Sequence, residues 1–130
     1  MEELEELSEH WREMAKRVLA DAKRSLSNGV YDAAAVSSWI AANLALSALF
    51  IKKTGLEPNV NAIPELLKAI SKVVDVPDQV KACKDMEKHC DKANSLDFVP
   101  LGERREAAEK AVTCAEVILS YVEGVLEEGD

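Results

Sequence analysis

The nineteen residues between Asp32 and Lys52 include no charged side chain, and this segment constrains the fold more than any other. Such a length is close to what a helix needs to span a membrane. The segment is nevertheless rich in Ala and Ser and contains Asn43, which suits a helix buried inside a protein. We therefore expect a central helix from Tyr31 to Lys53, apolar on nearly all sides, and no contact with a membrane.

Apolar residues at spacings of three and four predict an amphipathic helix before the central one. Ser27-Asn28-Gly29 then reads as a left-handed cap that ends this first helix. The apolar stripe of the helix consists of Leu4, Leu7, Trp11, Met14, Val18, Ala22 and Leu26.

Three further helices are predicted after the central one. A short helix begins at a cap on Asn61, and a fourth begins after the break at Asp75-Val76-Pro77. The last begins near Glu103. The inward residues are Ile63, Leu66, Leu67 and Ile70 in the short helix, and Val80, Cys83, Met86 and Cys90 in the fourth. The chain is thus expected to be all-α. We predict an up-and-down helical bundle of four main helices plus a short connecting helix, in a single domain over residues 1–130.

The charge balance limits the partners that this chain can attract. Its 24 acidic and 16 basic residues give a formal net charge of −8. General electrostatic attraction to nucleic acid requires the opposite excess. We therefore expect no DNA binding, and any contact with RNA would need a local basic patch. Glycine-rich phosphate loops and clustered metal ligands are absent from the sequence, so neither a cofactor nor a metal is predicted.

Cys83, Cys90 and Cys114 form an odd set without a CxxC pair. Cys83 and Cys90 are seven residues apart, too far along one helix for a disulfide. We predict that all three are reduced, mostly buried thiols in a cytoplasmic protein. No basic, apolar leader opens the sequence, so no signal peptide is expected.

The order of these segments resembles the HEPN family, the higher eukaryote and prokaryote nucleotide-binding domains. Residues 10–58 are similar to the first half of such domains: a Trp-led helix, a Gly29-Val30-Tyr31 turn, and an Ala-rich helix ending in Lys52-Lys53 and Gly55. Residues 63–70 resemble the short helix that follows. Residues 105–126 resemble the Ala-rich closing helix.

The resemblance implies two kinds of function. Catalytic HEPN members are metal-independent ribonucleases with an Arg four to six residues before a His. Here His89 has Lys84 at the shortest spacing, and no Arg occupies any of the three positions. Lys supplies charge but lacks the planar fork of Arg. The sequence therefore favours a non-catalytic binding or assembly module. The alternative is a divergent ribonuclease that uses Lys84 and His89.

A basic face on the fourth helix is the candidate anion site. Lys81, Lys84, Lys88 and Lys92 share this face by their spacing, and Arg104, Arg105 and Lys110 open the next helix. With the family resemblance, they suggest binding of a nucleotide, RNA or another anion. Intervening acidic residues also allow these cations to be an ordinary solvated face.

Two further expectations concern the central helix. Asn43 lies in its apolar run, where an unpaired amide is costly. It either forms a buried hydrogen bond that fixes helix register or lines a ligand cleft. The small residues Ala34, Ser37, Ser38, Ala41, Ala45 and Ala48 permit close approach of a second chain, which predicts a homodimer. The resemblance adds a second partner, a minimal nucleotidyltransferase, because HEPN proteins pair with such enzymes in toxin–antitoxin couples.

Overall fold

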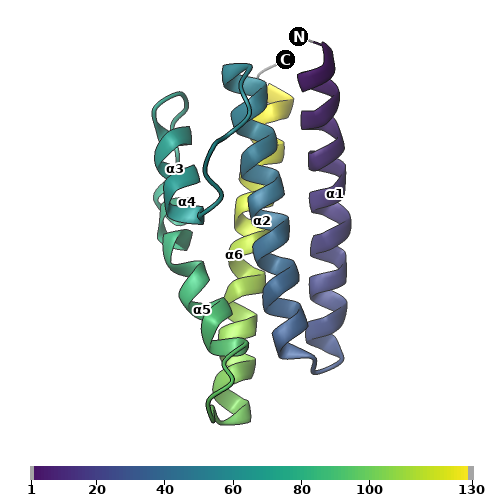
Figure 1. The fold of residues 1–130 in the computed structure, drawn as a ribbon, viewed down its shortest axis with the longest axis vertical. Coiled ribbons are helices and arrows are strands. Elements are labelled where there is room, and N and C mark those ends of the chain that lie inside the picture. Colours follow the sequence, from purple (N-terminus) through teal and green to yellow (C-terminus); the bar gives the residue numbers. More distant parts are fainter. Residues whose placement is uncertain (1, 129–130) are drawn as a thin grey trace.

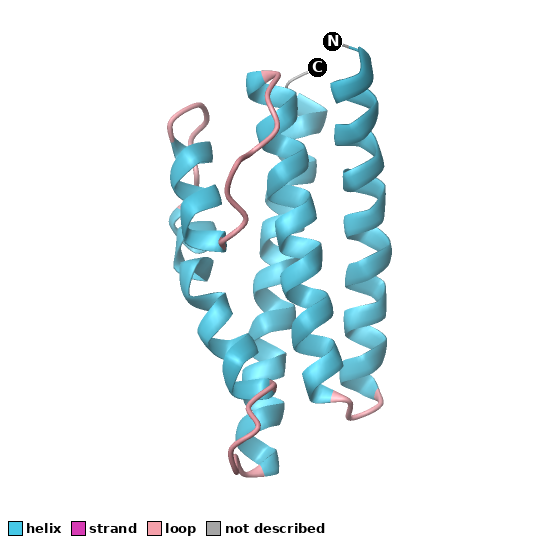
Figure 2. Ribbon diagram, viewed as in Figure 1, coloured by secondary structure: helices cyan, strands magenta, loops and turns pink. Residues whose placement is uncertain are grey.

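The chain folds into a bundle whose main helical segments, α1, α2, α4–η1–α5 and α6, stand side by side and alternate in direction (Figure 1). The computed structural model describes residues 2–128, and within them helices are joined by loops only (Figure 2). The elements are α1 (Glu2–Ser27), α2 (Tyr31–Thr54), α3 (Ile63–Ser71), α4 (Asp78–Lys81), the 3-10 helix η1 (Ala82–Asp85), α5 (Met86–Ala93) and α6 (Leu101–Glu128). The predicted all-α, up-and-down bundle with α3 as a short connecting helix is confirmed.

Helix α2 forms the centre of the bundle. It packs along α1 and α6 over much of its length and also contacts α3 and α5. Ala34, Ala41, Ala45 and Ala48 are fully buried, because their small side chains let the neighbouring helices come close. By length and composition alone α2 is apolar enough to cross a membrane, but 61% of its most apolar stretch is buried inside the bundle.

Two glycines end the first two helices in the way that the sequence predicts. Gly29 and Gly55 have φ values of +75° and +73°, in the left-handed region that favours glycine. At the end of α1, the Val30 amide donates to the Ser25 carbonyl at 2.9 Å, which completes the turn into α2.

The predicted fourth helix is continuous but is not uniformly α-helical. Its central four residues form η1, between α4 and α5. Val80, Cys83 and Met86 are buried at a spacing of three, which matches the three residues per turn of a 3-10 helix. The next buried residue, Cys90, follows at the α-helical spacing of four. The tighter 3-10 turn thus keeps all four predicted inward residues, from Val80 to Cys90, packed against the core.

Two predicted helix starts need correction. Helix α6 begins at Leu101 rather than near Glu103, because the Pro100 carbonyl accepts hydrogen bonds from the Glu103 and Arg104 amides at 3.0 and 3.1 Å. Asn61 does not cap α3. The residue before this helix is Ala62, and no side chain caps it.

Candidate functional site

The lysines of the predicted basic face do not share one set of neighbours. Lys81 and Lys84 line a hollow of about 230 Å³ against α3, together with Lys68. Lys92 pairs instead with Glu103 of α6, at 3.0 Å, and Lys88 with Asp85, at 3.7 Å. A 3-10 helix rotates by more per residue than an α-helix does. The η1 segment therefore turns Lys88 and Lys92 away from the direction of Lys81 and Lys84.

The hollow beside α3 holds unpaired positive charge. Lys68, Lys81 and Lys84 are exposed, and within residues 2–128 none lies within ion-pair distance of a carboxylate. Pro64, Leu67 and Ser71 complete its lining, so the hollow is apolar in part. An anion with a small apolar portion fits this chemistry.

Arg104 is not available to bind an anion, although it belonged to the predicted anion site. Its guanidinium donates to the carbonyls of Ala93 (3.0 Å), Ser95 (2.8 Å), Asp97 (2.8 Å) and Val99 (3.3 Å). These bonds occupy four of the five N–H groups of the side chain. Arg104 therefore holds the loop between α5 and α6 in place.

The remaining cations at the start of α6 pair along their own helix. Arg105 lies 3.9 Å from Glu109, and Lys110 lies 3.1 Å from Glu106. Both pairs are exposed, so each contributes little to stability. The structure does not bring these residues together with Lys81 and Lys84.

Within one chain, Lys84 and His89 do not converge. Lys84 faces α3, whereas His89 lies near Lys110, Lys88 and Lys92 on the side of α6. Partial burial, followed by the nearby Lys110, lowers the pKa of His89, and Asp85 only partly opposes this. The imidazole is therefore mainly neutral at pH 7.

Asn43 has a structural partner in the loop before α3. Its side-chain amide donates to the Asn61 carbonyl and so joins α2 to that loop. A second link is nearby: the Trp39 indole donates to Glu87 at 2.9 Å, and the same carboxylate oxygen accepts from the Ile63 amide at 3.4 Å. Asn43 is only partly buried, so it holds a loop rather than a register deep in the core.

The prediction of three reduced cysteines is wrong for two of them. Cys83 of η1 and Cys114 of α6 form a disulfide, with 5.6 Å between their Cα atoms. The sequence argument compared only cysteines on one helix, and the pairing occurs between two helices. Cys90 is free and buried, and burial raises the pKa of its thiol to about 12. The cytoplasmic location remains a prediction.

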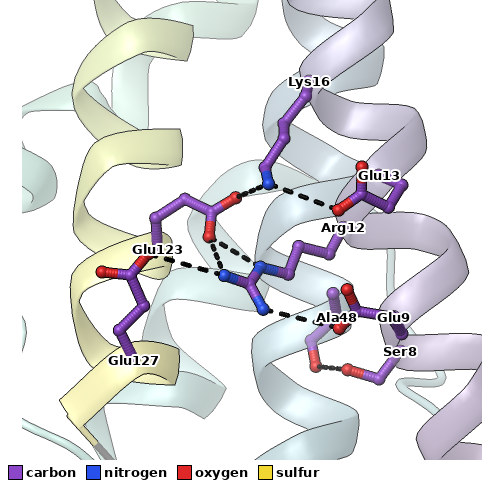
Figure 3. A network of polar contacts seen from close by, with 8 residues as sticks. All are labelled: Ser8, Glu9, Arg12, Glu13, Lys16, Ala48, Glu123 and Glu127. Carbon is purple, nitrogen blue, oxygen red and sulfur yellow. Dashed lines mark hydrogen bonds and ion pairs between the residues drawn. The ribbon is translucent and has the colours of Figure 1, made fainter.

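The seam between α1 and α6 is closed by charged groups (Figure 3). Glu123 lies between Arg12, whose Nε donates at 2.6 Å, and Lys16, whose Nζ is 3.1 Å away. Burial tends to raise the pKa of Glu123, but the hydrogen bonds from Arg12 and Lys16 outweigh it, and the pKa is lowered. Ser8 donates to the Ala48 carbonyl at 2.7 Å, which holds α1 against α2.

The small residues predicted to form a dimer contact are mostly inside the monomer. Of that set only Ser37 is not buried, so α1, α5 and α6 already cover the others. The apolar residues that α2 leaves exposed are Val36, at 44%, and Ile40, at 38%. They are four residues apart and therefore form one outward stripe.

The sequence analysis missed the apolar character of the α5–α6 loop. Leu96, Phe98 and Leu101 are 104%, 91% and 69% exposed. These three residues are visible in the sequence between Asn94 and Gly102, but only the structure shows that none of their side chains turns inward. Within residues 2–128, no three His, Cys, Asp or Glu side chains gather as metal ligands.

Comparisons with known proteins agree on one family. A family model described as the HEPN domain matches residues 8–125. The crystal structure of an HEPN domain protein from Thermotoga maritima is similar, with 28% identity, coverage of 91% of this chain and 98% of that one, and a TM-score of 0.75. The crystal structure of TT1696 from Thermus thermophilus is also similar, with 28% identity, coverage of 90% of this chain and 96% of that one, and a TM-score of 0.75.

A third structure, ST0689, an archaeal HEPN homologue, is 22% identical over 90% of this chain and 95% of its own, with a TM-score of 0.65. At that identity the likeness concerns the fold alone. No curated protein is similar enough to this chain to count as a match.

Proposed function

This chain belongs to the HEPN domain family, and on that premise we propose that it is a non-catalytic binding and assembly module. The proposal rests on one observation: α2 keeps an apolar stripe, Val36 and Ile40, turned to the outside. Two half-buried residues, Trp39 and Leu44, border the stripe and widen it. Exposed apolar surface of this kind commonly marks an interface.

A homodimer is the first assembly that we propose. The stripe lies on one straight helix, so a two-fold axis can place α2 of each chain against the other. Such a contact buries Val36 and Ile40 without disturbing the alanines of the core. Family resemblance supplies the second proposed partner, a minimal nucleotidyltransferase, in a toxin–antitoxin pair.

Light scattering at micromolar concentration tests the homodimer. The chain has a mass of 14.2 kDa, and we expect about twice that value. Val36→Asp or Ile40→Asp should dissociate the homodimer and give the mass of a single chain, because each would bury an unpaired charge in the contact. Leu56→Asp is the matched control, since Leu56 is 63% exposed but lies outside the stripe. A mass near 14.2 kDa that does not rise with concentration rejects the homodimer.

Co-expression tests the nucleotidyltransferase partner. If a small nucleotidyltransferase gene adjoins the gene for this chain, the two proteins should purify together from a tag on either one. Absence of such a neighbour, or separation of the two proteins at moderate salt, rejects this pairing and leaves the homodimer unaffected.

Binding of a nucleotide or another phosphate-bearing anion is a second candidate function. The supporting observation is the hollow with Lys68, Lys81 and Lys84, where positive charge is left unpaired in an acidic chain. Lys binds phosphate as a point charge and does not need the planar geometry of Arg.

Calorimetric titration with ATP and with inorganic pyrophosphate tests the anion site. Lys81→Ala with Lys84→Ala should weaken binding by about tenfold or more, since each removed contact with an anion is worth roughly 1 kcal/mol. Lys88→Ala with Lys92→Ala is the matched control, because these lysines already pair with Asp85 and Glu103. Equal effects of the two double variants, or no binding to the native chain, reject the site.

A further inference from the structure

The α5–α6 loop and the first residue of α6 expose apolar side chains to an unusual degree. Leu96, Phe98 and Leu101 lie within six residues of one another and are 104%, 91% and 69% exposed. Single exposed apolar residues are normal on proteins. Three large ones in so short a segment are not ordinary scatter, and gathered apolar surface marks sites of interaction.

The loop is held in place by its own hydrogen bonds. The Arg104 guanidinium binds the carbonyls of residues 93, 95, 97 and 99, and the Asp97 amide donates to Ser95 Oγ at 3.1 Å. Asn94 donates from its side chain to the Cys90 carbonyl at 2.9 Å, at the end of α5. The backbone is therefore ordered before any partner arrives, which lowers the entropy cost of binding.

A hollow beside the loop extends the patch to another part of the chain. It measures about 410 Å³ and lies between the loop and the α1–α2 turn, with Val30, Leu96 and Leu101 in its lining. Val30 is itself 46% exposed. Figure 1 shows the loop and the turn at the same end of the bundle. The patch, defined as Val30, Leu96, Phe98 and Leu101, thus combines projecting side chains with a space that can receive one.

The edge of this patch is acidic. Asp32 and Asp97 are exposed, and within residues 2–128 neither lies within ion-pair distance of a cation. One cation, Arg104, lines the same hollow and bonds only backbone carbonyls, so it keeps its positive charge. Two carboxylates against one guanidinium leave the edge of the patch with a net negative charge.

That charge decides which occupant fits. A second copy on a two-fold axis would bring the same net negative charge to the contact, and like charges across an interface are unfavourable. An anionic lipid surface would be repelled for the same reason. A partner that places an apolar side chain in the hollow and cations at the edge meets neither penalty.

We propose that the patch of Val30, Leu96, Phe98 and Leu101 docks a segment of another protein in which an apolar anchor is flanked by Lys or Arg. The anchor enters the hollow, Phe98 packs on the segment, and its cations meet Asp32 and Asp97. This patch is separate from the α2 stripe, and the inference does not depend on the homodimer.

Selection from a displayed library of random peptides tests the proposal. The immobilised full-length chain is the target, and peptides that also bind the Phe98→Ser variant are removed. We expect the surviving peptides to combine apolar residues with Lys or Arg. Their affinity should fall by roughly tenfold or more for Phe98→Ser and Leu96→Ser, as for an anchor at the centre of an interface. Leu56→Ser is the matched control, an exposed leucine outside the patch.

Two further measurements keep the test decisive. Asp32→Asn with Asp97→Asn should weaken the same peptides, and the weakening should be smaller at high salt. The inference is overturned if no peptide depends on Phe98, or if the selected peptides carry no excess of Lys or Arg. It is also overturned if Phe98→Ser dissociates a homodimer, or if it abolishes sedimentation of the chain with lipid vesicles. The first of these last two results would assign the patch to a second copy, and the second would assign it to a membrane.

Discussion

Arg12 of α1 donates from Nε to Oε2 of Glu123 in α6, at 2.6 Å, and so joins the first helix of the chain to the last. The two side chains are only 18% and 19% exposed. Because α1 touches α6 along a narrower seam than it touches α2, this ion pair lies where the contact that closes the bundle is narrowest (Figure 3).

Replacing Glu123 should destabilise the protein in a pH-dependent manner. Glu123→Gln removes the charge that faces Arg12 and Lys16 and should lower the free energy of unfolding by about 1.5–3 kcal/mol at pH 7. The pKa of Glu123 is lowered in the folded state. Its contribution is therefore full above the ordinary carboxyl pKa of 4.5 and is lost as the pH falls through the folded-state pKa.

Urea unfolding at pH 7 and below pH 4 checks this prediction. The difference between native protein and Glu123→Gln should shrink in acid. Glu127→Gln is the control, because Glu127 is 72% exposed and lies 3.8 Å from Arg12. A difference that stays constant with pH would show that the charge of Glu123 does not act as described.

Two glycine-to-alanine substitutions should have opposite effects. Gly29 has a φ of +75°, so Gly29→Ala should cost about 1–2 kcal/mol of stability. Gly124 lies within α6, and a Cβ added there meets no atom within 4 Å. Gly124→Ala should therefore stabilise the protein by about 0.5–1 kcal/mol. Thermal unfolding of both variants provides the comparison, and a shift in the same direction for both would contradict it.

The cysteine pairing predicts a definite pattern of thiol labelling. In denaturant without reductant, only Cys90 should react, and all three cysteines should react after reduction with a dithiol. The loop closed by Cys83 and Cys114 has a sequence separation of 31. Cys114→Ser should then lower the free energy of unfolding by about 3–4 kcal/mol under non-reducing conditions and far less with dithiol present. Reaction of three thiols before reduction would contradict the disulfide.

We expect no cleavage of RNA. The family's Arg is absent, and Lys84 and His89 face different neighbours within the chain. Structured and unstructured RNA would be incubated with the protein at neutral pH, with chelator present. Cleavage that persists in His10→Ala but disappears in His89→Ala would establish the divergent ribonuclease instead.

The helices were predictable because each leaves a local signal. The uncharged run of α2, the stripe of α1 and the glycines that follow both can be read without knowledge of tertiary contacts. The helix boundaries near residue 101 and the 3-10 turn were less accessible. They depend on the Pro100 carbonyl and on which face meets the core, and these are properties of the folded chain.

The candidate site could be predicted only in part for the same reason. Spacing placed four lysines on one face, but η1 changes the twist between Lys84 and Lys88. The spacing of residues in the sequence also cannot show that Lys68 of another helix completes the hollow. Nor can it show that the Arg104 guanidinium donates its hydrogen bonds to backbone carbonyls. Which cation finds a carboxylate, a carbonyl or only water is decided by tertiary packing.

The separation of inward and outward residues on α2 has a consequence for how such proteins diverge. The alanines at 0% exposure leave no space for a larger side chain, so selection for a foldable bundle acts on them directly. Val36 and Ile40 lie on the same helix and are free of that pressure, because they touch solvent. Mutation at these two positions can therefore change the outer surface of α2 in a descendant while leaving its bundle intact.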